Sequence, residues 1–329
     1  MTIWANKSIL SVSADNLEGF LLDKRLTAFD YFVSLVIILL IVANVASFFF
    51  GVRYGANEME TKYLAIINKD KKPDRSKDSY HQEHIVSYYY NIFEPTRTFE
   101  EKWFTLYDAL LYKESVSDIE DQLDQLRDSV NQEYDRVRAA TMPASSSYLV
   151  DAQKNALKSL TLFKESLAVL SQAASTVSQD ELLKRINKEP NYIEARNFAL
   201  LARQMYFTAI VEWNKTINSQ LKGVALVNKK DVSIAEWKSM NLNLKAQTMS
   251  QLMTAEKHYT LALPLDYVGK LDEMVRTGQA ESLNLKTAGG ALQTLISTKA
   301  VRNGDFPTMK EKFYGSEFLP ALPFYSEVR

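Results

Sequence analysis

An uncharged apolar run near the start of the chain constrains its fold more than any other feature. Residues 31–52 read YFVSLVIILLIVANVASFFFGV and include no charged side chain and no proline. As an α-helix this run is roughly 33 Å long, enough to cross the hydrocarbon core of a bilayer. Aromatic residues stand at both ends, as they do at the two interfaces of membrane helices. The run therefore predicts a transmembrane helix. A buried helix of a soluble domain is the alternative, and it seldom stays uncharged over such a length.

This span divides the chain into four segments. We expect a short juxtamembrane tail over 1–30, the transmembrane helix over 31–52, a helical extension with a charged linker over 53–79, and a helical-bundle domain over 80–329. No cleavage site of small residues follows the apolar run, so we interpret it as an uncleaved anchor and not as a signal peptide. The charged run NKDKKPDRSKDS at 68–79 is interpreted as a solvated loop, with contact to anionic headgroups as the alternative.

The charges that flank the span do not decide its orientation. Lys24 and Arg25 precede it within fifteen residues, and Arg53 and Lys62 follow it, so the positive-inside rule gives a tie. The chain contains no cysteine, which excludes disulfides, thiolate metal sites and thiol catalysis, and favours an exported domain. We therefore expect a single-pass protein of the cell membrane with its large C-terminal domain outside the cytoplasm.

The large domain carries the apolar periodicity of helices. Apolar side chains recur at steps of three and four over 119–137 and 149–170, with a proline and serines between them. This pattern predicts two antiparallel helices. Glycine and proline number only 10 and 8, which disfavours a fold with many strands and turns. We therefore predict an all-α, antiparallel helical bundle. Further helices are expected over 181–188, 191–222, 233–263, 266–276 and 280–299.

Aromatic residues concentrate at both ends of this domain. Segment 80–115 is dense in tyrosine and phenylalanine, and Pro95 is expected to split it, with a helix that starts at Thr98. Such density is typical of a core, and a surface that stacks carbohydrate or peptide is the alternative. From Arg302 onward, glycines and prolines alternate with aromatic residues. This composition predicts an extended aromatic C-terminal tail that packs back onto the bundle, because disordered tails usually lack aromatics.

The residues that usually carry chemistry are sparse. His81 and His84 would share a helix face, with Glu83 between them and Asp78 one turn earlier. Metal binding there is conceivable, but the HExxH order of zinc enzymes is absent, and we interpret both as surface histidines. No GxSxG, GxxxxGK[ST] or GxGxxG motif occurs. We therefore assign no catalytic, cofactor-binding or metal-binding residue. A serine–histidine–aspartate triad stays open, because its members need not be close in sequence.

One face of the predicted span carries small and polar residues. Ala43, Ser47 and Gly51 recur every four positions, and Asn44 borders them. Small residues let membrane helices approach closely, and an asparagine amide in lipid seeks a partner. These four residues predict a helix–helix contact within the membrane and hence a possible homo-oligomer. A single tolerated asparagine near one end of the span is the alternative.

Together these features favour a membrane-anchored helical domain of the cell envelope with a binding or sensory role. Lipid contacts the anchor, and an envelope protein, a peptide or a small ligand is the expected partner. The formal net charge of −1 gives no reason to expect nucleic acid. In outline the architecture resembles the four-helix sensory domains of bacterial receptors, although those lie between two spans and no motif assigns the chain to them. A structural or assembly subunit of a membrane complex is the alternative function, and an enzyme is the third.

Overall fold

The computed structural model describes residues 80–113, 116, 118–226, 232–315 and 317–325. These residues form helices joined by loops, and their only extended pairing is an isolated bridge between Ser233 and Thr287. The all-α prediction is confirmed for this part of the chain. The predicted transmembrane helix and both segments that flank it lie outside the described residues. Among the helices that are described, none is both long enough and apolar enough to cross a membrane.

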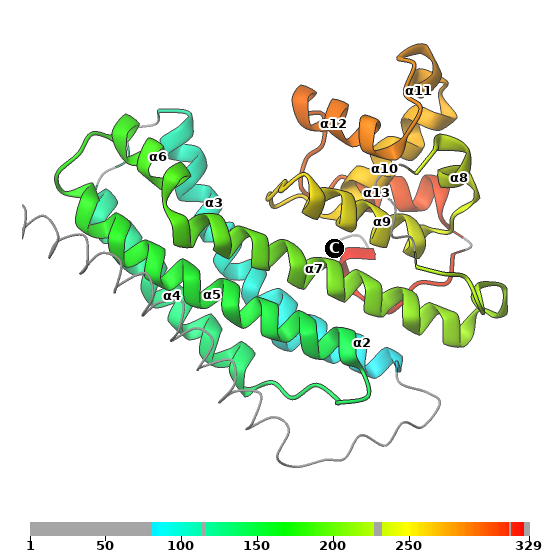
Figure 1. The fold of residues 1–329 in the computed structure, drawn as a ribbon, viewed down its shortest axis with the longest axis horizontal. Coiled ribbons are helices and arrows are strands. Elements are labelled where there is room, and N and C mark those ends of the chain that lie inside the picture. The colour runs from blue at the N-terminus through cyan, green and yellow to red at the C-terminus, as the bar shows by residue number, and fades with distance from the viewer. Residues whose placement is uncertain (1–79, 114–115, 117, 227–231, 316, 326–329) are drawn as a thin grey trace, which may run out of the picture. The chain divides into compact units, whose positions relative to one another are not determined.

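Four long helices of the described region form a bundle (Figure 1). Each packs on a neighbour, α3 on α4, α4 on α5 and α5 on α7, and α4 and α5 are the antiparallel hairpin that the periodicity predicted. Leu123, Val130 and Leu167 are fully buried in this hairpin, as their spacing requires. The bounds are α3 Glu94–Leu111, α4 Ile119–Ala139, α5 Ser147–Ala174 and α7 Pro190–Ile217, with the short α6 Gln179–Lys188 leading into α7.

The aromatic segment before α3 is one nearly continuous helix, which corrects the prediction that Pro95 splits it. Helix α2 (Gln82–Tyr88) passes through one π-helical stretch, η2 (Tyr89–Phe93), directly into α3. Pro95 lies in the first turn of α3. Proline is tolerated at that position, and the wider π-turn before it suits a chain that lacks one N–H donor.

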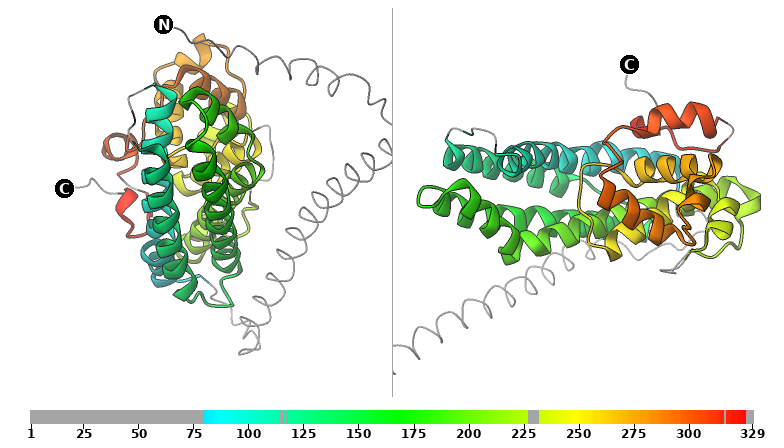
Figure 2. Two further views of the ribbon diagram at one scale, coloured as in Figure 1. Left: turned by 90° about the vertical axis from the view of Figure 1, so that its left-hand side faces the viewer. Right: turned by 90° about the horizontal axis from the view of Figure 1, so that it is seen from above.

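The remaining helices gather around the C-terminal half of α7 (Figures 1 and 2). Helix α9 packs on both α7 and α10, and α10 packs on α12 and α13. We refer to this group as the C-terminal helical group. Its members are η3 Ser219–Leu221, α8 Ile234–Ser239, α9 Leu242–Ala255, α10 Pro264–Arg276, α11 Gln279–Ser282, α12 Ala288–Thr298, α13 Phe306–Phe313 and η4 Pro323–Tyr325.

Several predicted helices end earlier than the periodicity suggested. The expected helix over 233–263 is two helices, because Asn241 adopts an extended conformation and its side chain accepts a hydrogen bond from the N–H of Leu244, which starts α9. The expected helix over 280–299 breaks before Thr287, which caps α12 in the same way. Helix α7 ends at Ile217 and not near residue 222. At Asn241 and Thr287, therefore, a polar side chain that caps the next helix sets the boundary, although the apolar pattern continues across it.

The tail is extended only in part. Helix α13 forms within it, with Pro307 in its first turn, whereas residues 317–325 are irregular apart from the single turn η4. We call residues 317–325 the C-terminal segment. Its packing against the helices agrees with the prediction, since Leu322 and Tyr325 are buried and the ring of Phe324 contacts those of Tyr89 and Phe207.

Candidate functional site

A buried carboxylate organises the C-terminal helical group. Asp272 of α10 accepts hydrogen bonds from Trp237 Nε1 at 2.6 Å, from Lys245 Nζ at 2.7 Å and from the Tyr314 hydroxyl at 2.5 Å. The side chains of Lys245 and Asp272 are only 9% and 4% exposed, so the ion pair is largely shielded from water. Burial and the adjacent Asp272 carboxylate raise the pKa of Tyr314, which keeps its hydroxyl protonated as a donor.

Buried asparagines hold the C-terminal segment in place. The carbonyl oxygen of Phe318 accepts hydrogen bonds from Asn243 Nδ2 at 2.9 Å and from Asn214 Nδ2 at 3.3 Å. The Tyr325 hydroxyl donates to Asn243 Oδ1 at 3.1 Å, and a carboxylate oxygen of Glu317 accepts from the Leu242 N–H at the start of α9. Both asparagines are fully buried. Side chains on α7 and α9 therefore fix the backbone of a segment that has almost no regular structure of its own.

An open cleft of about 600 Å³ lies beside this segment. Its walls come from η2, from α13 and from the chain that follows α13. A second hollow, of about 320 Å³, lies between the start of α4 and the end of α5. The first cleft has the size range of small-molecule and peptide sites, and it combines aromatic walls with a few polar groups. Its lining includes Tyr90, Lys310, Tyr314, Glu317, Pro320 and Tyr325.

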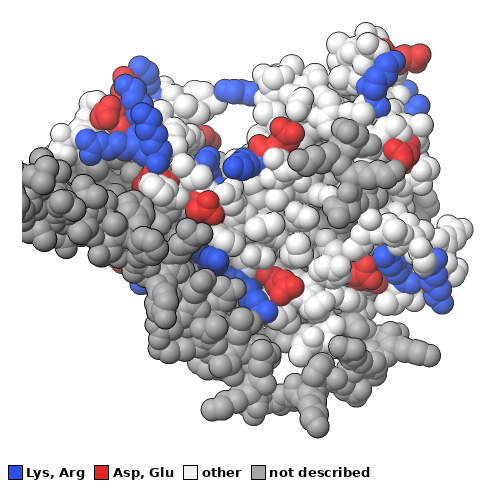
Figure 3. Space-filling view, viewed as in Figure 1, with Lys and Arg blue, Asp and Glu red and all other residues white. Residues whose placement is uncertain are grey.

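One exposed aromatic residue lines this cleft, and another lies in the chain between two lining residues. Phe318, between the lining residues Glu317 and Leu319, is 60% exposed, and Tyr90 is 51% exposed. On the face that Figure 3 presents, lysine and arginine side chains gather over α6, and the other charged side chains, of both signs, are scattered. The ring of Phe318 is thus exposed on a segment whose backbone is held by buried side chains.

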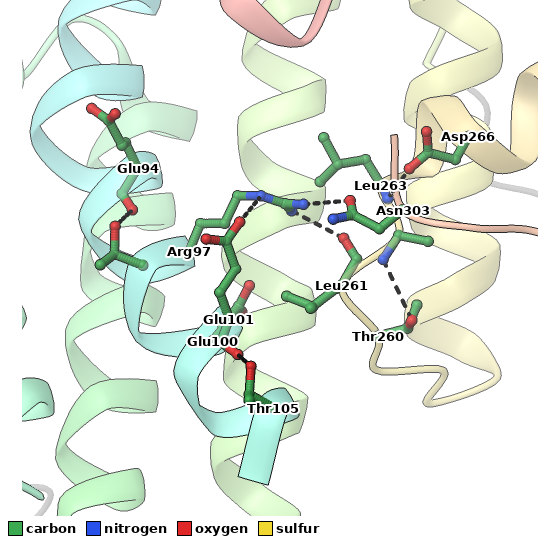
Figure 4. A network of polar contacts seen from close by, with 12 residues as sticks. Glu94, Arg97, Glu100, Glu101, Thr105, Thr260, Leu261, Leu263, Asp266 and Asn303 are labelled. Atoms are coloured by element: carbon green, nitrogen blue, oxygen red, sulfur yellow. Dashed lines mark hydrogen bonds and ion pairs between the residues drawn. The ribbon is translucent and has the colours of Figure 1, made fainter. Parts of the chain in front are cut away.

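Two arginines of the bundle, Arg97 and Arg203, fix the loop between α9 and α10, and Figure 4 shows the contacts of Arg97. Arg97 of α3 donates to the carbonyl of Leu261 at 3.0 Å and to Asn303 Oδ1 at 2.5 Å. Arg203 of α7 donates to the carbonyl of Thr260 at 3.0 Å, and it forms a buried ion pair with Glu100 at 3.1 Å. These contacts attach the C-terminal helical group to the bundle through its backbone, and they position α10 and its Asp272.

The two histidines that the sequence singled out lie at the start of α2, and neither lines this cleft. The rings of His81 and His84 meet edge to face at 5.3 Å, and His84 Nδ1 lies 3.5 Å from the Ser146 hydroxyl. Burial and the neighbouring His81 lower the pKa of His84. Asp78 lies outside the described residues. Within the described residues, no group of three or more histidine, aspartate or glutamate side chains is placed to hold a metal ion.

The remaining predicted site also lies outside the described residues. It comprises Ala43, Asn44, Ser47 and Gly51 of the apolar run, so their helix–helix contact stays a prediction.

No protein-family model, curated protein or solved structure matches the chain. The candidate site is therefore interpreted from its geometry. Sequence reasoning did not single out its central residues, Asp272, Asn243 and Phe318. The one available signal was the aromatic density after Arg302, which indicated a packed tail but not the polar groups beneath it.

Proposed function

We propose that this chain is a membrane-anchored helical domain that binds a partner of the cell envelope through the cleft beside its C-terminal segment. One observation carries the proposal: the ring of Phe318 is displayed to solvent while two buried asparagines hold its backbone. Ordering a loop on binding costs free energy, and a segment that the fold has already ordered avoids that cost. A rigid, exposed aromatic residue beside a cleft suits a binding anchor.

The anchor and the side of the membrane are part of the same proposal. The uncharged run at 31–52 supports a single span, and the absence of cysteine supports an extracytoplasmic domain. Ala144 lies exposed in the α4–α5 connection, so a cysteine there is accessible to a probe. In intact cells, a thiol reagent that cannot cross the membrane should label Ala144→Cys. Labelling only after lysis would place the domain in the cytoplasm.

Site-specific photo-crosslinking in living cells tests the binding surface. A photoreactive phenylalanine analogue at Phe318 or Tyr90 should give a discrete crosslinked product of the full chain. Val169 and Leu283 are matched controls, because they are apolar, 53% and 50% exposed, and absent from the cleft lining. The analogue should give no such product there. Equal products at all four positions, or none at the two cleft positions, would refute the proposal.

The alternative role, a subunit of a membrane complex, uses the same surface differently. A subunit keeps its partner permanently, so nearly all of the chain should crosslink at Phe318 and the partner should co-purify in a fixed ratio. An exchangeable ligand gives partial crosslinking that free ligand reduces. The fraction of chain that crosslinks therefore separates the two roles.

A further inference from the structure

Three tyrosines line the cleft, and of their rings only that of Tyr90 is exposed; Tyr314 and Tyr325 are buried. The hydroxyls of Tyr314 and Tyr325 point away from it, since they donate to the buried Asp272 and Asn243. Burial raises the pKa of both tyrosines, so neither offers a phenolate. Pro320 adds a further apolar face to the lining. The exposed ring of Tyr90 therefore suits a flat or apolar group, and the tyrosine hydroxyls of the lining that are engaged inside the fold are not available to a sugar.

Only two charged side chains line the cleft, and they differ in what they are free to do. Glu317 is engaged, because one of its carboxylate oxygens accepts the Leu242 N–H. Lys310 is a partly buried residue of the lining, and no described residue forms an ion pair or hydrogen bond with its ammonium. Its neighbour Lys312, by contrast, lies over the ring of Phe313. The cleft therefore gives a ligand one positive charge without a described partner, on Lys310, and one exposed aromatic ring, that of Tyr90.

Part of the backbone along the cleft has no hydrogen-bond partner among the described residues. Leu319 and Ala321 line it in an irregular stretch, and their N–H groups make no hydrogen bond with any described residue. Asn214 and Asn243 fix the position of this stretch, because both donate hydrogen bonds to the Phe318 carbonyl oxygen. Extended peptides bind such exposed backbone by main-chain hydrogen bonds, and side-chain pockets supply the specificity.

From these contacts we propose that the cleft binds an extended peptide segment of a protein partner, one that places an aromatic or proline residue against the exposed ring of Tyr90 and a carboxylate on Lys310. This inference rests on the proposed binding function and names its ligand class. The carboxylate follows from charge complementarity with Lys310, and the extended form follows from the free N–H groups of Leu319 and Ala321.

Selection from a random dodecapeptide library displayed on phage tests this inference. The bait is the full chain in detergent micelles. Selected peptides should be enriched in aromatic residues or proline together with aspartate or glutamate. Lys310→Glu should weaken their binding roughly fivefold to tenfold, as expected when a surface ion pair is replaced by repulsion. A second selection on Lys310→Glu should yield basic peptides in place of acidic ones.

Lys312→Glu is the matched control, because Lys312 lies on the same helix but does not line the cleft. It should leave the binding of the acidic peptides unchanged. Failure to enrich any peptide, enrichment without acidic residues, or equal effects of the two variants would overturn the peptide assignment. The crosslinking experiment separates this failure from a failure of the proposed function. If the peptide selection fails but a crosslinked product still forms at Phe318, the cleft binds a ligand of another kind.

Discussion

The α4–α5 hairpin and the C-terminal helical group are both helical, but they are stabilised in different ways. In the hairpin the buried positions are mainly leucine, valine and alanine at helical spacing, and six buried polar residues lie among them: Ser129, Glu133, Gln153, Ser159, Ser166 and Ser171. Helix α9 is buried around nearly its whole circumference, and its core includes Asn243, Lys245, Gln247 and Thr248. Both regions gain from apolar burial, but the C-terminal helical group also contains an ion pair that is shielded from water on both sides, between Lys245 and Asp272, and each of these charges needs the other.

This difference explains where specificity lies in the molecule. Apolar packing tolerates substitution of similar volume, while a buried polar group requires a donor or acceptor at one place and distance. The polar partners of α9 include Asp272 of α10 and Tyr325 of the C-terminal segment. The same contacts that stabilise the group therefore also set the position of the cleft. Variants that disturb one region and leave the other intact can test this division.

Asp272→Asn should have the largest effect, a loss of about 3–5 kcal/mol in free energy of unfolding, because it leaves the buried Lys245 ammonium without its counter-ion. Hydrogen exchange of the full chain in micelles, read by mass spectrometry, should show faster exchange in α8–α10 and unchanged exchange in α4–α5. Asp128→Asn on the exposed face of α4 is the control and should change stability by less than about 0.5 kcal/mol. Equal acceleration in both regions would show that they unfold as one unit.

Leu167→Ala should produce the converse pattern. Leu167 is fully buried in α5, and removing its side chain leaves a cavity that costs about 3 kcal/mol. Exchange should accelerate in α4, α5 and α7, with less change in α10 and α13. The result would contradict the division if peptides of α10 responded as strongly as those of α4.

The sequence predicted the first region far better than the second. The steps of Leu123, Val130 and Leu167 place three buried residues correctly, because apolar periodicity is a local signal. The contact between Asp272 and Lys245 joins residues 27 apart in the chain, and that between Asn214 and Phe318 joins residues 104 apart. No spacing rule encodes such pairs. The aromatic density of the tail therefore predicted that it packs on the helices. The sequence did not predict the hydrogen bonds from Asn214 and Asn243 that hold it there.

Asn243→Ala should have an intermediate effect, about 1–3 kcal/mol, confined to the contact between α9 and the C-terminal segment. The Tyr325 hydroxyl loses its acceptor and the Phe318 carbonyl loses one of two donors. Exchange at residues 317–325 should rise first, and crosslinking at Phe318 should fall because the ring is no longer held. Tyr325→Phe removes only the donor and should cost less. If crosslinking persisted at full yield in Asn243→Ala, the buried asparagine would have no part in displaying Phe318.

The smallest expected effect is a pH dependence at the loop between α9 and α10. His258 Nε2 lies 2.5 Å from the Tyr267 hydroxyl, and burial together with the Arg203 guanidinium lowers the pKa of His258. Burial and the nearby Asp266 raise the pKa of Tyr267 to about 12, so both partners are neutral at pH 7. An unfolded histidine titrates near pH ~6.5.

Below that pH, His258 binds a proton in the unfolded chain but remains neutral in the folded chain, because its pKa there is lower. The contribution of His258 to stability is therefore complete above the unfolded pKa, and it declines as the pH falls through and below that value. Exchange of the loop and of α10, corrected for intrinsic rates, should be faster at pH 5.5 than at pH 7.5, and His258→Gln should flatten this dependence. His84→Gln is the comparison in the bundle. The pKa of His84 is lowered as well. Because His84 lies in α2 and its ring is next to Ser146 and not next to α10, this variant should leave the response of α10 unchanged. A response of α10 that followed His84 instead would show that protonation in one region reaches the other.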